Sequence, residues 1–131
     1  MKKQQIKTVN APAAIGRYSQ AILATTENGD KTLYASGQIA IDPATGKLVD
    51  GGIEEQAERV MKNIGGILEA AGMTYSNVVK TTCLLADIAE FGKFNAIYGK
   101  YFQEEAPARS TFAVAALPMS ARVEVEVVAA K

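Results

Sequence analysis

Histidine and tryptophan are absent from this 131-residue chain, and Cys83 is its single cysteine. Zinc sites are built mainly from cysteine and histidine, so at most one such ligand is available here. Catalytic triads with a histidine base and Cys–His dyads are excluded within one chain for the same reason. A lone cysteine cannot form an internal disulfide, which suits a reducing compartment. We expect Cys83 to be a buried structural thiol on a strand beside the first helix.

An excess of charge is also lacking, because 14 basic residues balance 14 acidic ones. The chain therefore offers no basic footprint for nucleic acid and no patch for an anionic membrane. It has no Gly-x-Gly-x-x-Gly and no phosphate loop, so dinucleotide and nucleoside triphosphate sites lack support. No apolar stretch approaches the roughly 20 residues that cross a bilayer, and none follows Met1 as in a signal peptide. We expect a soluble, cytoplasmic protein.

The length fits one domain, residues 1–131, that can bury a core of its own. An extended N-terminal segment is followed by a loop over residues 10–16. Apolar and β-forming residues predict strands over Tyr18 to Thr25 and Lys31 to Ile41. An Asn-Gly turn lies between these strands, and Pro43 and Gly46 mark a second turn after them.

Two helices are predicted by the spacing of apolar residues. Ile53 to Ala71 carries an apolar stripe with charged residues on the other side, and Gly72 ends it. The pair Gly65-Gly66 inside this helix predicts close packing by a strand or by the second helix. The second helix follows a cap at Asp87, with Glu90 completing a capping box. Its aromatic stripe is interpreted as core: Phe91, Phe94, Tyr98, Tyr101 and Phe102.

Further strands are predicted over Asn77 to Leu85, Ser110 to Ala115 and Arg122 to Ala129. The order β-β-β-α-β-α-β-β indicates an α+β sandwich, with two helices on one face of a mixed six-stranded sheet. Val123, Val125 and Val127 alternate with polar residues on the last strand, so one face of the sheet is left for water or a partner. Small residues among the polar ones suit subunit packing, and we infer a homo-oligomer from them: Ala113, Ala115 and Ala129.

With so little other polar chemistry available, Arg109 and Glu124 are the candidate catalytic residues. An arginine presents paired N–H donors that match a carboxylate, and a glutamate can position or deprotonate a water. The pair therefore suits hydrolysis of a small carboxylic acid, while a structural ion pair or two unrelated surface charges remain open. In a tight hairpin near Pro118 the two residues would be offset by roughly 13 Å along the strands, at about 3.3 Å per residue. A ligand between them, the reach of the arginine or another strand order would have to join them.

Several sequence blocks resemble the signature blocks of the Rid (YjgF) family, also called the L-PSP endoribonuclease family. They run in order along essentially the whole chain: Asn10-Ala11-Pro12-Ala13-Ala14-Ile15-Gly16, Tyr18-Ser19-Gln20, Ser36-Gly37-Gln38-Ile39, Asp42-Pro43-Ala44-Thr45-Gly46, Val79-Lys80-Thr81-Thr82, Phe94-Asn95-Ala96-Ile97-Tyr98, Pro107-Ala108-Arg109-Ser110-Thr111 and Val123-Glu124-Val125-Glu126.

The resemblance implies a chorismate-mutase-like fold and a homotrimer with active sites between subunits. The implied activity is that of a 2-iminobutanoate/2-iminopropanoate deaminase, which hydrolyses reactive enamines and imines without a cofactor or a metal. Arg109 would hold the substrate carboxylate and Glu124 would activate the attacking water. The ligand would also be contacted by four further residues: Tyr18, Ser36, Gly37 and Asn95.

Two positions depart from the family pattern. Arg17 stands where proline is common, which places a charge beside Tyr18. Thr111 stands where many members have a reactive cysteine, so thiol chemistry is not expected there. The alternative functions are an endoribonuclease or translation inhibitor, a small-carboxylate sensor without activity, and a chaperone-like trimer. Nucleic acid is a poor fit to a neutral chain whose aromatic residues are interpreted as core.

Overall fold

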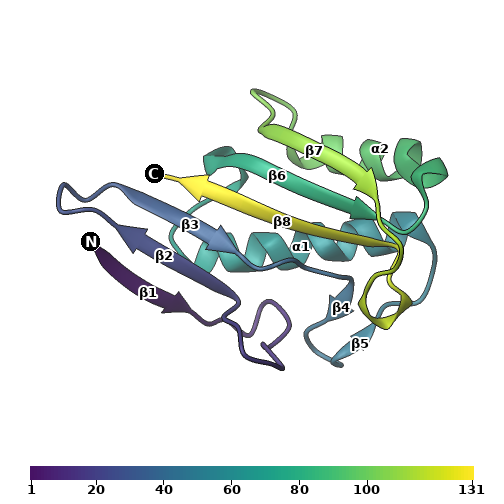
Figure 1. Ribbon diagram of the computed structural model, residues 1–131, viewed down its shortest axis with the longest axis horizontal. Helices are drawn as coiled ribbons and strands as arrows, with labels where there is room; N and C mark the ends of the chain where they lie inside the picture. Colours follow the sequence, from purple (N-terminus) through teal and green to yellow (C-terminus); the bar gives the residue numbers. More distant parts are fainter.

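A mixed six-stranded sheet with both helices behind it forms the body of the protein (Figure 1). The computed structural model describes residues 1–131. All neighbouring strands are antiparallel except β6 and β7, which are parallel. Across the sheet the strands are β1 (Lys2–Ile6), β2 (Ala21–Thr25), β3 (Lys31–Ala35), β8 (Val123–Ala130), β6 (Val78–Leu85) and β7 (Ala108–Ala113). The predicted α+β sandwich with a mixed six-stranded sheet is confirmed, and so is the predicted order of the six sheet strands and the two helices along the chain.

The helices are α1 (Ile53–Ala70) and α2 (Phe91–Tyr101), and one small hairpin, β4 (Ile41–Asp42) with β5 (Lys47–Leu48), leaves the main sheet. Short 3₁₀ turns are η1 (Tyr75–Asn77), η2 (Ile88–Glu90) and η3 (Pro118–Ser120). The buried apolar residues of both helices and of alternate sheet positions form one core cluster between the two layers. None of the helices is long and apolar enough to cross a membrane.

The first strands are shorter than predicted. β2 begins only at Ala21 and β3 ends at Ala35, so residues 18–20 and 36–40 lie outside these strands. Tyr34 is opposite Val128, and Gln38 is opposite Val125. The segment from Tyr34 to Gln38 is therefore one residue longer than the segment of β8 that it faces, which is the arrangement of a β-bulge. The bulge contains Ser36 and Gly37. The predicted turn after it is the loop of the β4–β5 hairpin, in which Gly46 adopts a φ of 72°.

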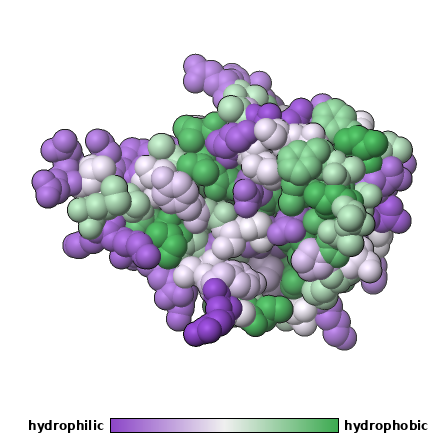
Figure 2. All heavy atoms as spheres, in the orientation of Figure 1, coloured by the Kyte–Doolittle hydropathy of each residue, from purple (hydrophilic) through white to green (hydrophobic).

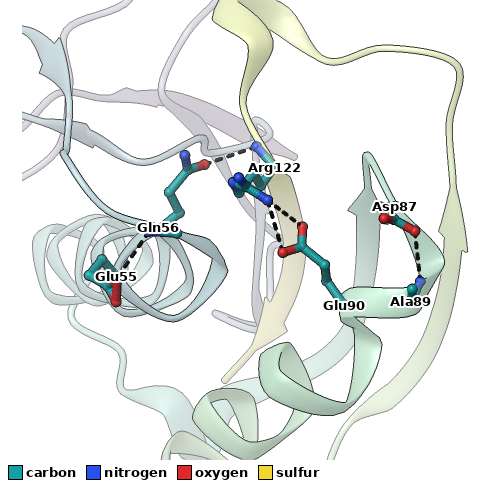
Figure 3. Close-up of polar contacts among 7 residues, drawn as sticks. Glu55, Gln56, Asp87, Ala89, Glu90 and Arg122 are labelled. Carbon is teal, nitrogen blue, oxygen red and sulfur yellow. Dashed lines mark hydrogen bonds and ion pairs between the residues drawn. The ribbon is translucent and has the colours of Figure 1, made fainter.

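The aromatic stripe of α2 is confirmed as core in its main part. Phe94, Tyr98 and Phe102 are buried, and Phe91 and Tyr101 pack partly buried against the cluster. The capping prediction needs a correction. The Asp87 side chain accepts from the Ala89 N–H at 2.9 Å and so caps η2 rather than α2 (Figure 3). Glu90 binds the Arg122 guanidinium instead of closing a capping box.

The uncovered face of the sheet mixes exposed apolar and polar side chains, and Figure 2 shows this mixture from the side on which no helix lies. The strand registers and burial place Tyr34, Leu84, Phe112, Glu124 and Glu126 on it. Tyr34 remains 55% exposed and Phe112 48% exposed, which leaves apolar area for a partner. The prediction that Ala129 belongs to this face is wrong, because Ala129 is fully buried toward the helices with the valines of β8.

The glycine pair of α1 does mark close packing, but neither a strand nor α2 supplies it. A Cβ at Gly65 would meet the Tyr75 hydroxyl, and one at Gly66 would meet the backbone carbonyl of Asn10. Tyr75 belongs to η1 and its hydroxyl donates to the Met61 carbonyl at 2.7 Å. The glycines therefore allow the N-terminal loop and η1 to lie directly on the helix.

Gly66→Ala should destabilise the fold by about 1–3 kcal/mol, because a methyl group would be forced against backbone that cannot move aside. Gly99→Ala is the matched control, since it lies inside α2 with open space at its Cβ position and should stabilise by up to about 1 kcal/mol. Urea unfolding of both variants measures the difference. Equal stabilities would show that the contact with Asn10 does not constrain α1.

Candidate active site

Glu124 lies in a cleft of about 670 Å³ at the end of β3. Its carboxylate rests against the backbone of Gly37, where any side chain would overlap it. Gly37 is held there because Gln38 and Val125 exchange two backbone hydrogen bonds, of 2.9 and 3.1 Å. The absence of a Cβ at position 37 is therefore what lets a carboxylate approach the bulge this closely. The cleft is also lined by apolar side chains, among them Ile15, Ile39 and Met119.

Ser36, Gly37 and Tyr18, for which ligand contact is predicted, all border the Glu124 cleft. The Ser36 hydroxyl donates to the Ser19 carbonyl at 2.6 Å, so its oxygen keeps free lone pairs for a further donor. The Gly37 N–H has no acceptor within the chain. Tyr18 is 50% exposed at the cleft wall. These groups form a polar end in an otherwise apolar cleft, an arrangement typical of small-molecule sites.

The chemistry of Glu124 is set by its surroundings. Burial raises the pKa of the Glu124 carboxyl, and the neighbouring charge of Glu126 raises it further. A raised pKa makes the carboxylate a better proton acceptor than an exposed glutamate. No basic side chain forms an ion pair with it in this chain. Glu124 is thus available for proton transfer rather than tied up in a structural salt bridge.

Arg109 lies on the edge strand β7, against one face of α2. Its Nη1 donates to the Asn95 side-chain oxygen at 2.7 Å. The guanidinium carbon lies 4.7 Å from the Tyr98 ring centre and 5.3 Å from that of Phe91. No carboxylate neutralises Arg109 within the chain. The interpretation of Arg109 and Glu124 as an ion pair within one chain is therefore wrong.

Arg109 and Glu124 lie on opposite faces of the sheet. Arg109 is opposite Thr81 on β6, and Thr81 is buried toward the helices. Glu124 is opposite Leu84 on the same strand, on the uncovered face. A hairpin of the last two strands would have placed them on adjacent strands, offset along the chain direction, but β6 lies between β7 and β8. The structure brings Glu124 together with Tyr18, Ser36 and Gly37, and Arg109 with Asn95, and it does not join the two groups.

The start of β8 is fixed by two contacts that no sequence pattern indicated (Figure 3). The Gln56 side chain on α1 accepts from the Arg122 N–H at 2.9 Å. The Arg122 guanidinium donates to both oxygens of Glu90, at 2.9 and 3.0 Å. Because Glu124 is two residues further along, these contacts set where its strand begins. Gln56 is nearly fully buried, so its hydrogen bond is made away from water.

Comparison with known proteins identifies the family to which this chain belongs. The model of the family described as endoribonuclease L-PSP matches residues 8–131. This chain belongs to that family. A rat protein named 2-iminobutanoate/2-iminopropanoate deaminase is 54% identical over 127 residues, covering 97% of this chain and 89% of the rat protein. The human protein of the same name is 52% identical over 127 residues, covering 97% and 89%.

Solved structures of the L-PSP family confirm the fold. A Yersinia pestis protein of the conserved Rid family, described as having an unknown function, is 48% identical and superposes with a TM-score of 0.91. The match covers 99% of this chain and 100% of that chain. The resemblance to the Rid family is thereby confirmed over the length of the sheet and both helices.

The two departures from the L-PSP family pattern lie in different settings. Arg17 is exposed in the loop before β2. Thr111 is opposite Cys83 in the register of β6 and β7, and its buried hydroxyl oxygen has no hydrogen-bond partner. Cys83 is free and fully buried, as predicted, and burial raises the pKa of its thiol. Such a thiol is a poor nucleophile.

Two residues at Arg109 were missed by the sequence argument, which assigned Phe91 and Tyr98 to the core alone. Together with Asn95 they recur at positions four and three apart, so they share one face of α2. That spacing was visible in the sequence. What was not visible is that β7 lies beside this face, since strand order is set by contacts between distant segments.

Proposed function

We infer that this protein is a deaminase that hydrolyses 2-imino and 2-enamino acids to 2-oxo acids and ammonia. The observation that carries the proposal is the pair of incomplete half-sites. One offers an unneutralised guanidinium for a carboxylate, and the other offers a basic carboxylate in a cleft. Relatives more than half identical to this chain are named for this reaction. A single Rid-type domain over residues 1–131 would supply both half-sites in each copy.

The two half-sites would be joined by assembly into a homotrimer. Within one chain the sheet separates Arg109 from Glu124, whereas a neighbouring copy packed on the uncovered face could bring its Arg109 to this cleft. Tyr34 and Phe112, both about half exposed on that face, supply apolar area for the contact. Symmetric closure gives each cleft one arginine from one subunit and one glutamate from the next.

The reaction needs only the groups of these two half-sites. Arg109 binds the substrate carboxylate with its forked donors, which orients the imine carbon in the cleft. Glu124 takes a proton from a water as the water oxygen bonds to that carbon. The resulting carbinolamine receives this proton on its nitrogen. Its hydroxyl proton then passes by way of Glu124 to the departing nitrogen, the C–N bond breaks, and ammonia leaves as the hydroxyl oxygen becomes the carbonyl of the 2-oxo acid. Ser36 and the Gly37 N–H would contact the ligand beside Glu124, and Tyr18 would form the wall.

The proposal is tested by generating 2-aminoacrylate or 2-aminocrotonate in place with a dehydratase and following loss of the imine. The protein should accelerate the loss above the spontaneous rate. A rate equal to the spontaneous one would reject the proposal. A carboxylate sensor would bind 2-oxobutanoate without changing the rate. A nuclease would cleave RNA in the presence of a chelator, and the neutral charge of the chain gives no support to that activity.

Activity should fall at acidic pH, with a midpoint above the ordinary range of a glutamate. Only the ionised Glu124 can take the proton, and its raised pKa delays ionisation to higher pH. Glu126→Gln removes one of the two causes, so the acidic limb of kcat/KM should move to lower pH. Glu27→Gln, on the exposed turn between β2 and β3, is the matched control and should leave the profile unchanged. An unmoved limb in Glu126→Gln would contradict Glu124 as the base.

The same raised pKa has an effect on stability with a defined sign. Because the folded state holds the Glu124 proton more tightly than the unfolded chain does, ionisation weakens the fold as pH rises through this range. The loss of activity at low pH is therefore not caused by this group unfolding the protein.

We place the protein in the cytoplasm, supported by its single, free cysteine.

A further inference from the structure

Arg109 is held by three side chains from one face of α2. Asn95 accepts its Nη1 hydrogen bond, and the rings of Phe91 and Tyr98 lie against its guanidinium. A guanidinium is attracted to an aromatic face, so these contacts favour one position of the cation. Only one of its five N–H donors is used within the chain, and the others remain free for a carboxylate. Arg109 is thus positioned without being neutralised.

The Tyr98 ring is itself held from the sheet. Its hydroxyl shares a 2.8 Å hydrogen bond with the Thr81 hydroxyl on β6. Both residues are buried, Tyr98 to 4% exposure and Thr81 to none, so water does not compete for this bond. Thr81 is also the residue directly opposite Arg109 in the parallel pair of β6 and β7. One threonine therefore fixes the ring that lies against the arginine beside it.

We propose that Thr81 and Tyr98 are positioning residues, which act through Arg109 to hold the substrate carboxylate. The proposal rests on the proposed function, because it concerns the arginine half of the same site. The hydrogen bond stops the phenol ring from tilting, and the ring in turn keeps the guanidinium in the place where its free donors meet the ligand. Neither residue touches the reacting carbon, so the chemical step stays with Glu124.

Removal of this hydrogen bond should weaken carboxylate binding more than it slows the chemical step. Tyr98→Phe keeps the ring and loses the hydroxyl, while Thr81→Val keeps the shape and loses its partner. Each should raise KM by about three- to tenfold, the range of one buried hydrogen bond, with kcat changed by less than about twofold. The dissociation constant of 2-oxobutanoate, measured by calorimetry, should rise by the same factor. Thr81→Ser keeps the hydroxyl, so KM and the dissociation constant of 2-oxobutanoate should both stay near their wild-type values.

The double variant Thr81→Val with Tyr98→Phe tests whether the two single changes raise KM through their shared hydrogen bond or through two independent defects. Thr81→Val also removes the 3.9 Å bond that the Thr81 hydroxyl accepts from the Cys83 thiol, but both changes break the same bond to Tyr98, so the double variant should be no worse in KM than Thr81→Val alone. Tyr75→Phe is the matched control. It removes a hydroxyl bond to the Met61 carbonyl in the neighbouring aromatic cluster and should lower the melting temperature while leaving KM unchanged.

Unchanged KM and unchanged 2-oxobutanoate binding in folded Tyr98→Phe would overturn the proposal, and so would a fall in kcat alone. Thr81→Ser that fails to restore binding would also contradict it. The proposed function fails separately: wild type would then show no deaminase activity, while Tyr98→Phe would still weaken 2-oxobutanoate binding. Melting curves of each variant verify that the folded protein is compared.

Discussion

Arg109→Ala should lower kcat/KM by at least about a hundredfold, because a bound carboxylate would lose two charge-assisted hydrogen bonds. The structure supports this size of effect, since Arg109 has no other ionic partner and is held in place by Asn95 and two rings. Arg109→Lys should recover only part of the loss, because an ammonium group lacks the planar fork of arginine. Steady-state kinetics with the dehydratase-generated imine measure both variants.

The control for Arg109→Ala is Lys93→Ala, which removes an exposed cation from α2, the same helix that carries Asn95. It should keep wild-type kinetics, since an exposed charge contributes little through water and salt. If Arg109→Ala kept its affinity for 2-oxobutanoate, the carboxylate would be held by another group. The assignment of the arginine half-site would then be wrong.

Glu124→Gln should lower kcat by about a hundredfold to ten-thousandfold, the range contributed by a positioned base. Glutamine keeps the shape of the side chain against Gly37 but cannot take a proton from water. Binding of 2-oxobutanoate should remain near that of wild type, because Arg109 provides the affinity. The rate should fall at every pH, in contrast to the shifted profile expected for Glu126→Gln.

Glu126→Gln is also the matched control for this loss, because Glu126 lies on the same strand and the same face of the sheet as Glu124. It should retain most of the activity at neutral pH. A Glu124→Gln variant with wild-type kcat would show that water attacks without this carboxylate. The base would then have to be sought elsewhere in the cleft.

The order of strands and helices was predictable, because it follows from local periodicity. Val123, Val125 and Val127 of β8 alternate with polar residues and do face the helices. The early end of β3 was not predictable, since it depends on the bulge that carries Gly37 and on the distant partner Val125. The position of β6 between the last two strands likewise results from packing between remote segments, which no local pattern encodes.

The candidate site was predictable in its residues but not in its geometry. Arg109 and Glu124 stood out because the chain has so few other groups for catalysis, and the family blocks gave them roles. Their separation onto opposite faces required the register of both strands with β6. The contact of Tyr98 with Arg109 was not predicted, because the same ring also packs in the core and was assigned to the core alone.

We expect each active site to take Arg109 from one subunit and Glu124 from another. The most direct test unfolds Arg109→Ala and Glu124→Ala together in equal amounts, refolds the mixture and measures deaminase activity. Random assembly should restore intact sites in about one quarter of the clefts, and hence about one quarter of wild-type activity, although each variant refolded alone is inactive. A mixture no more active than the separate variants, in trimers verified to be mixed by mass spectrometry, would contradict the shared site.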